Sequence, residues 1–210
     1  MLQEMKKIAV IFLLCIVNTT NAQKKYTGFF ELSTPKKLWV MFHPFKAKKA
    51  FRISEETNKV SDSIRKTNLL DKDASGGQVD AFRHAFWMAR LRQELGKTAA
   101  RSLGKAHERE NYKTFKKRKL EDGIVPDEIS SIMDLHNNEQ GLALVVKGEK
   151  ISQKELILRV LNTIKKGKMR VIKKDANGNF LTCNGKPILQ STLKGKWKNN
   201  KCLIPSNPKT

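Results

Sequence analysis

Apolar side chains recur every three or four positions through most of the chain, which places them on one face of an α-helix. The most regular segment spans 78–95, and Gly96 follows it as a stop signal. Its predicted inward positions are Val79, Phe82, Phe86 and Ala89. The pattern therefore predicts a mainly α protein.

Further helices are predicted on both sides of this segment. Thr34 and Pro35 have the pattern of an N-cap followed by proline in the first turn, and Pro44 should stop that short helix. Gly141 is expected to interrupt the end of a later helix. The other predicted helices cover 47–66, 98–115, 125–146 and 152–166.

Residues 169–210 follow a different pattern. Two short β-like runs flank Asn177 and Gly178, a dipeptide typical of hairpin turns. We therefore predict a single helical-bundle-like domain over 23–168, followed by a small C-terminal β-hairpin appendage. A disulfide between Cys183 and Cys202 would staple the appendage, and two unpaired thiols are the alternative.

The first 22 residues have the composition of a signal peptide. Two lysines precede an apolar run from Ile8 to Val17, and Ala22 ends a cleavage-like sequence. The run is too short to span a bilayer, so no transmembrane segment is expected after cleavage. A lipid anchor at Cys15 is disfavoured because Leu14 precedes it. We expect an exported protein, periplasmic or secreted, in a compartment where disulfides persist.

The chain is strongly basic, with 42 Lys and Arg against 20 Asp and Glu and a formal net charge of +22. Such a charge favours polyanionic partners, among them an anionic envelope component. The basic residues are spread along the chain, and no aromatic residues alternate with them as single-strand recognition requires. Nucleic acid is therefore not expected as the specific partner, and a solvated basic surface is the alternative.

Three predicted helices carry polar side chains that could meet at one place. Asp80 and His84 are four residues apart and share a helix face, with Arg83 beside them and Trp87 one turn further on. Because buried charges must be paired or bound, we expect the helices to meet there. The candidates on the other two helices are His107, Glu108, Asp134, His136, Asn137 and Asn138.

The helical spacing also predicts how these residues point. His107 lies in line with an apolar stripe and should face inward, with Glu108 about 100° around the helix from it. Asp134 and Asn138 share a face. His136 lies on the other side of an ideal helix and would join only if the helix were distorted.

Two chemistries fit these residue types. Carboxylates and imidazoles suit zinc or a harder divalent ion, for which our ligand hypothesis is His84, Glu108 and Asp134. Alternatively, His84 polarised by Asp80 is a general base, Glu108 the acid, and Asn137 or Arg83 stabilises negative charge. We assign catalysis to Asp80, His84, His107, Glu108, Asp134 and Asn137, and binding to Arg83, Trp87, His136 and Asn138. The remaining alternative is an internal hydrogen-bond network that locks the helices.

Three motifs together resemble a bacterial family of uncharacterised domains, number 6973 in the domain-of-unknown-function series. They are DAFRHAFW at 80–87, HE at 107–108 and MDLHNNEQG at 133–141. Met88 and Leu142 depart from the family pattern, in which Asn and Arg are common at these places. The resemblance implies a helical domain with this polar set and no established reaction.

Together these features predict an exported helical hydrolase that acts on an anionic envelope or extracellular substrate. If the polar site binds a divalent cofactor such as zinc, the hydrolase is metal-dependent. The alternative is a non-catalytic polyanion-binding module whose polar cluster is structural. A nuclease is a weaker third reading, since charge alone supports it.

Overall fold

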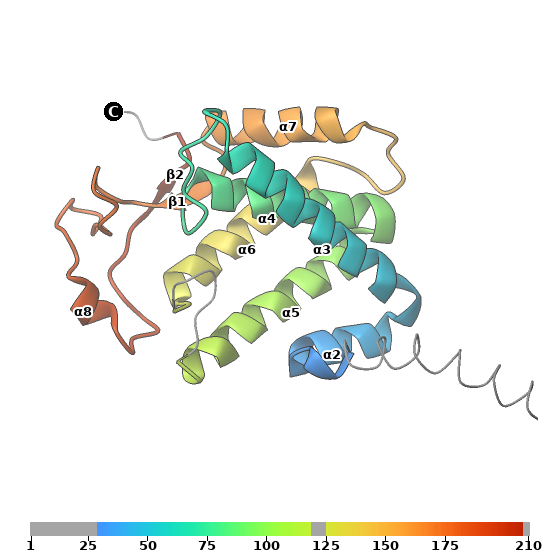
Figure 1. Ribbon diagram of the computed structural model, residues 1–210, viewed down its shortest axis with the longest axis horizontal. Coiled ribbons are helices and arrows are strands. Elements are labelled where there is room, and N and C mark those ends of the chain that lie inside the picture. Colours follow the sequence, from blue (N-terminus) through green and yellow to red (C-terminus); the bar gives the residue numbers. More distant parts are fainter. Residues whose placement is uncertain (1–28, 119–124, 208–210) are drawn as a thin grey trace, which may run out of the picture.

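A computed structural model describes residues 29–118 and 125–207, so the predicted signal peptide at 1–22 lies outside the described residues. The mainly α fold is confirmed (Figure 1). Its helices are α2 (Thr34–Phe42), α3 (Pro44–Arg65), α4 (Gln78–Leu95), α5 (Lys97–Lys116), α6 (Glu128–Ala143), α7 (Gln153–Lys165) and the short α8 (Gln190–Leu193).

Helix α4 is the centre of the bundle and contacts α3, α5, α6 and α7. In Figure 1, α3 crosses in front of α4 and α7 lies along the top. Burial of α4 is nearly complete along its apolar face, because helices cover it on several sides. The predicted inward residues Val79, Phe82, Phe86 and Ala89 are all in the core.

Helix starts differ slightly from the predicted ones. Ser33 is the N-cap of α2, one residue before the predicted cap, and Pro44 begins α3 instead of only ending α2. Asp127 caps α6 by accepting from the Ser130 backbone N–H, and the Ser130 hydroxyl completes a capping box.

Gly141 does not interrupt α6, as the sequence suggested, but lies inside it and is buried. A Cβ placed on this glycine would be 2.3 Å from the backbone oxygen of Ala85 in α4. Only a residue without a side chain lets the two backbones approach this closely. The glycine therefore reflects helix packing and not a helix end.

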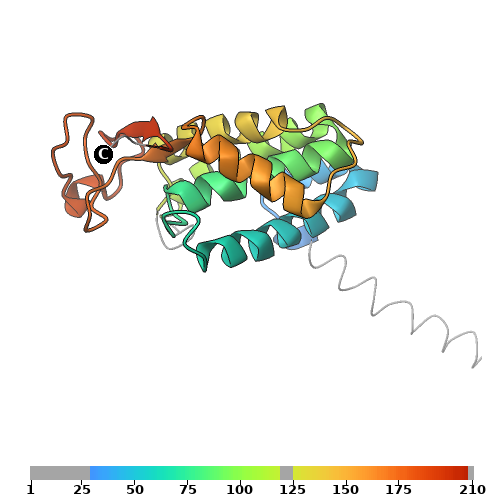
Figure 2. The same cartoon turned by 90° about the horizontal axis from the view of Figure 1, so that it is seen from above.

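The predicted β appendage is present, although its ladder is not local. Strand β1 (Arg170–Ile172) pairs antiparallel with β2 (Leu203–Pro205), far along the chain. The turn at Asn177 and Gly178 forms as well, closed by an isolated bridge between Lys174 and Phe180. Figures 1 and 2 show this appendage projecting from one end of the helical layer.

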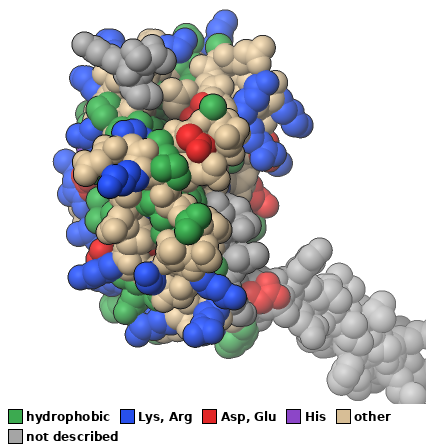
Figure 3. All heavy atoms as spheres, turned by 90° about the vertical axis from the view of Figure 1, so that its left-hand side faces the viewer, with side chains coloured by type: hydrophobic (Ala, Val, Ile, Leu, Met, Phe, Trp, Pro, Cys, Tyr) green, Lys and Arg blue, Asp and Glu red, His purple; other side chains and the backbone are tan. Residues whose placement is uncertain are grey.

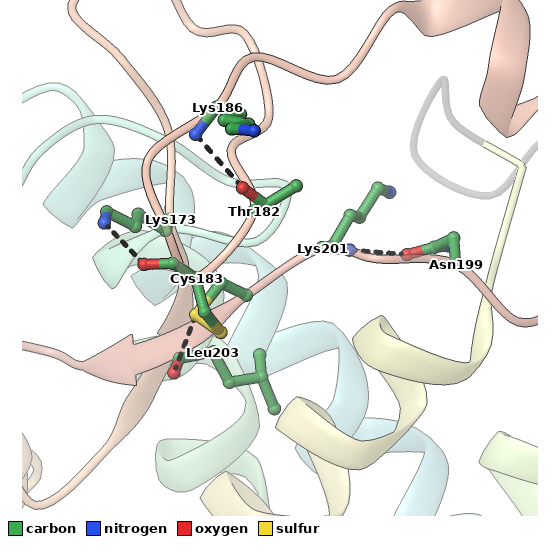
Figure 4. The surroundings of a disulfide bond; sticks show 8 residues. Lys173, Thr182, Cys183, Lys186, Asn199, Lys201 and Leu203 are labelled. Carbon is green, nitrogen blue, oxygen red and sulfur yellow. Dashed lines mark hydrogen bonds between the residues drawn. A yellow bond between two sulfur atoms is a disulfide. The ribbon is translucent and has the colours of Figure 1, made fainter.

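The predicted disulfide between Cys183 and Cys202 is formed, with an S–S distance of 2.10 Å. It ties the loop after the turn to the start of β2 (Figure 4). The Lys173 ammonium donates to the Cys183 carbonyl beside it, at 3.3 Å. The bridge thus holds together an appendage that has few strand residues of its own.

Basic side chains are dispersed over the surface that Figure 3 shows, between hydrophobic and acidic ones, without one continuous basic patch. Among the helices that the structure describes, none combines the length and the apolar character needed to cross a membrane.

Candidate metal centre

Asp80 and His84 of α4 and Asp134 of α6 form a buried cluster at the contact between the two helices. One ligand atom from each lies within 4.8 Å of the others. His84 Nε2 is 3.3 Å from Asp134 Oδ1 and 3.6 Å from Asp80 Oδ1. The structure thus brings three of the predicted site residues together.

Asp80 is oriented by its neighbours at the start of α4. The Gly76 backbone N–H donates to Asp80 Oδ2 at 2.8 Å, and Arg83 Nη2 donates to Asp80 Oδ1 at 2.7 Å. Both contacts hold the carboxylate in one orientation. Since Arg83 is one turn further along the same helix, the local sequence alone positions this acid.

The imidazole of His84 is oriented by Asn138 of α6. Its Nδ1 lies 3.2 Å from Asn138 Oδ1, and an amide oxygen only accepts hydrogen bonds. Nδ1 therefore carries the proton, and the Nε2 lone pair faces the carboxylates of Asp80 and Asp134. A lone pair facing two carboxylate oxygens is repelled unless a proton or a metal cation lies between them, and the second case is the arrangement of a metal-binding histidine.

The protonation state of His84 supports the same conclusion. Burial lowers the pKa of His84 well below its ordinary value, and the positive charge of Arg83 and the neighbouring His107 lower it further. The hydrogen bond with Asn138 acts in the opposite direction but is outweighed. His84 is therefore neutral near pH 7, which is the form that binds metals.

A small cavity of about 50 Å³ opens beside the cluster, and all three candidate ligands line it. A buried water needs roughly 10 to 15 Å³ of such space, so the cavity has room for an ion with a few waters but for no large substrate. Ser130, Phe180 and Lys201 are among the other residues that line it. Phe180 and Lys201 were missed in the sequence because they come from the appendage, and no helical spacing links them to α4. Ser130 lies four residues before Asp134 on α6, and this spacing could have indicated it.

A second cavity, of about 250 Å³, also reaches His84 and Arg83. Trp87 lines it, and its indole N–H donates to the Ser54 hydroxyl at 3.0 Å. Lys36 of α2 and Thr57 of α3 line it too, and nothing in their sequence context marked them as site residues. Arg83 and His84 are thus shared by the small cavity beside the two carboxylates and by a larger one that Lys36 also borders.

His107 lines this larger cavity and is half-buried. Its ring lies 5.7 Å from that of Trp87 and 6.1 Å from that of His84, measured between centroids. It is therefore near the cluster without belonging to it.

Glu108 is buried but lies outside the ligand group, where Asp80 takes the place that the sequence hypothesis gave it. Glu108 Oε2 accepts a hydrogen bond from Asn111, and the residue borders a separate apolar groove. The helical spacing placed Glu108 on a face of α5 but did not show that this face borders the apolar groove and not the cavities beside His84.

Asn137 and His136 are placed away from both cavities. The Asn137 amide is fully buried and bonds the backbone N–H and carbonyl of Arg170, each at 2.9 Å, which ties α6 to β1. His136 Nε2 lies 2.9 Å from the Lys168 carbonyl oxygen, on the other side of α6 as an undistorted helix requires. The contacts described for these two residues are with other parts of the chain and not with the cluster. Their catalytic and binding roles therefore stay predictions.

Comparison with known proteins gives one match. Residues 37–168 match the family model described as Domain of unknown function (DUF6973), and this range contains every residue of the cluster. No curated protein and no solved structure matches the chain. Because the match covers more than half of the chain, the protein belongs to the DUF6973 family, as its three motifs predicted.

Proposed function

We propose that the protein is a divalent-metal-dependent hydrolase in which Asp80, His84 and Asp134 are the protein ligands. The observation that carries the proposal is the convergence of an unprotonated imidazole nitrogen and two carboxylates beside a cavity large enough for an ion. An imidazole nitrogen and carboxylate oxygens are ligand atoms that suit zinc and manganese. Three protein ligands leave positions open, and an ion held there would supply a water of lowered pKa as the nucleophile.

Neighbouring residues orient each ligand. Asn138 fixes the ring of His84, and Gly76 and Arg83 fix the carboxylate of Asp80. Such contacts hold the ligands in one geometry before the ion arrives, which is the usual role of the groups around a metal site.

The general-base alternative fits the geometry less well. Both ring nitrogens of His84 are directed at protein groups, Nδ1 at Asn138 and Nε2 at the two carboxylates. The acid of that mechanism, Glu108, borders a different groove.

An anionic substrate is proposed because cations line the larger cavity. Arg83 and Lys36 both border it, and Arg83 also contacts the ligand Asp80. A substrate anion held there would lie next to the metal cluster. Action in the periplasm or outside the cell is part of the proposal, and the disulfide and the N-terminal sequence support it.

The test is metal binding by the full chain after treatment with a chelator, followed by calorimetric titration with Zn²⁺, Mn²⁺ and Mg²⁺. One ion should bind per chain. His84→Ala and Asp134→Asn should each weaken it roughly hundredfold or more, since each removes a ligand. His136→Ala is the matched control, because this imidazole lies on the same helix as Asp134 but points away from the cluster.

Activity is then measured with chromogenic phosphomonoester, phosphodiester and carboxylic ester probes in the presence of the ion that binds best. Turnover of one class, lost in both ligand variants and kept in His136→Ala, would support the proposal. A folded wild-type chain that binds none of the ions would overturn it, and the cluster would then be a helix-locking network.

A further inference from the structure

Four apolar side chains form an exposed strip at the corner between α2 and α3. Leu38, Met41 and Phe42 lie at helical spacing on α2, and Phe45 follows at the start of α3. Met41 is 66% exposed, Phe42 80% and Phe45 99%. We name these four residues the aromatic corner. A run of large apolar side chains this exposed marks a surface that binds something.

The strip is held rigidly, because the opposite face of the same helices is anchored in the core. Trp39 is buried, and its indole N–H contacts the Ala99 carbonyl at 3.1 Å and the Ser102 hydroxyl at 2.9 Å. Ala50 and Ile53 anchor α3 in the same way. Phe42 and Phe45 therefore project from a fixed base.

The surroundings of the aromatic corner are cationic. No acidic residue stands between Glu31 and Glu55, whereas the segment carries Lys36, Lys37, Lys46, Lys48, Lys49 and Arg52. Lys36 and Lys49 pair with acids and Lys46 bonds a backbone carbonyl. Within the part of the chain that the structure describes, Lys37, Lys48 and Arg52 form no ion pair. Their charge is complementary to an anionic surface.

We propose that the aromatic corner docks the protein onto an anionic membrane. Apolar side chains at the water–lipid boundary, flanked by Lys and Arg, are the pattern of helices that lie on a bilayer. A side chain as exposed as Phe45 fits insertion between lipid headgroups, because no neighbouring residue shapes a pocket around it. This inference does not depend on the metal site.

The placement suits such docking. Figures 1 and 2 show the corner at the end of the helical layer opposite the β appendage. Lys36 and Ser54, which line the larger cavity, belong to the same two helices. Docking would therefore bring this cavity close to the membrane surface.

The test reports on position 45 itself, because the apolar run at 8–17 would also hold the full chain on lipid. In a Cys15→Ser background, Phe45→Cys carries an environment-sensitive fluorophore, since Cys183 and Cys202 are bridged. Leu189→Cys, an exposed position on the appendage, is the matched control. Vesicles of phosphatidylcholine with phosphatidylglycerol should shift the emission of position 45 to the blue, and lipid-borne quenchers should reach it but not position 189.

Two variants then separate the contributions. Phe42→Ser with Phe45→Ser should weaken vesicle binding by about tenfold or more, from the loss of buried apolar surface. Lys48→Glu with Arg52→Glu should remove the preference for anionic over purely zwitterionic vesicles. The proposal is overturned if position 45 stays in water while the chain is on vesicles. It is also overturned if the label is shielded without lipid in a concentration-dependent way, which would make the corner an interface with a second copy.

Discussion

His84 Nε2 and Asp134 Oδ1 approach to 3.3 Å across the contact between α4 and α6. The approach depends on a second contact two turns along α6, where Gly141 meets the backbone of Ala85. Asp134 and Gly141 are seven residues apart and so lie on one face, and Ala85 follows His84 directly. One glycine contact therefore sets the helix spacing that brings the imidazole and the carboxylate together.

Metal affinity should change little between about pH 7 and pH 6, because no proton competes for His84 in that range. The pKa of this buried imidazole is held well below its ordinary value of 6.5, so protons displace the ion only at lower pH. Calorimetry at several pH values in two buffers checks this, since binding should release almost no proton from His84. A loss of affinity of about threefold from pH 7 to pH 6 would show instead a histidine with its ordinary pKa, which becomes largely protonated over this range.

Gly141→Ala should unfold more easily than wild type and lose metal affinity. The added Cβ would meet the Ala85 oxygen at 2.3 Å and its Cα at 2.6 Å, and backbone atoms cannot move aside. Overpacking of this kind costs roughly 1 to 3 kcal/mol, or more. Thermal and urea unfolding measure the loss.

Gly104→Ala is the matched control, since its added Cβ would meet only side-chain atoms of Asn138 and Met88, at 3.3 Å. Those atoms can shift slightly, and alanine favours the helix by about 1 kcal/mol. The two effects should nearly cancel. Equal stability of both variants would show that the close approach at Gly141 is not needed.

The helices were predictable because each reflects its own local pattern. The bounds of α4 follow from apolar spacing ended by Gly96, and Asp80 with His84 follows from a separation of four residues on it. The disulfide between Cys183 and Cys202 could be predicted because the sequence has two cysteines after the proposed cleavage site. These inferences needed no knowledge of packing.

Contacts between elements were not predictable in the same way. Spacing on α5 could not show that Glu108 borders another groove, nor that Asp80 completes the group with His84 and Asp134. Gly141 was predicted to end its helix because the residue it packs against, Ala85, belongs to another helix and could not be inferred from local sequence. The partner of β1 was hidden as well, since the Asn177 turn favours a local hairpin over the distant strand that pairs in the ladder.

Asp127→Ala should be strongly destabilising because this carboxylate has two roles. It caps α6, and its Oδ2 pairs at 2.6 Å with the Lys201 ammonium, which is buried over the ring of Phe180. Losing the cap costs about 1 kcal/mol, and leaving the buried ammonium unpaired about 3 to 5 kcal/mol. Chemical unfolding gives the total.

The double variant Asp127→Ala with Lys201→Met separates these roles. Replacing the ammonium by an apolar side chain removes the unpaired charge, so the double variant should be more stable than Asp127→Ala alone. If it is not, the pair contributes little and the destabilisation comes from the cap.

Glu110 should make the protein sensitive to acid. Partial burial raises the pKa of this carboxyl, but hydrogen bonds from His107 and Lys36 outweigh it and lower the pKa to about 2, from an ordinary 4.5. A depressed pKa stabilises the fold fully above about pH 4.5. That contribution is lost as the pH falls from there toward 2. It should amount to about 2 kcal/mol once solvent screening of this partly exposed group is considered.

Melting temperatures of wild type and Glu110→Gln across this pH range measure the effect. The variant should be less stable at neutral pH and should lose less on acidification, because its amide does not titrate. Lys36→Met should give part of the same flattening, since the pKa of Glu110 rises when one of its partners is removed. Parallel pH curves for wild type and Glu110→Gln would mean that the contacts of Glu110 with Lys36 and His107 do not couple protonation to folding.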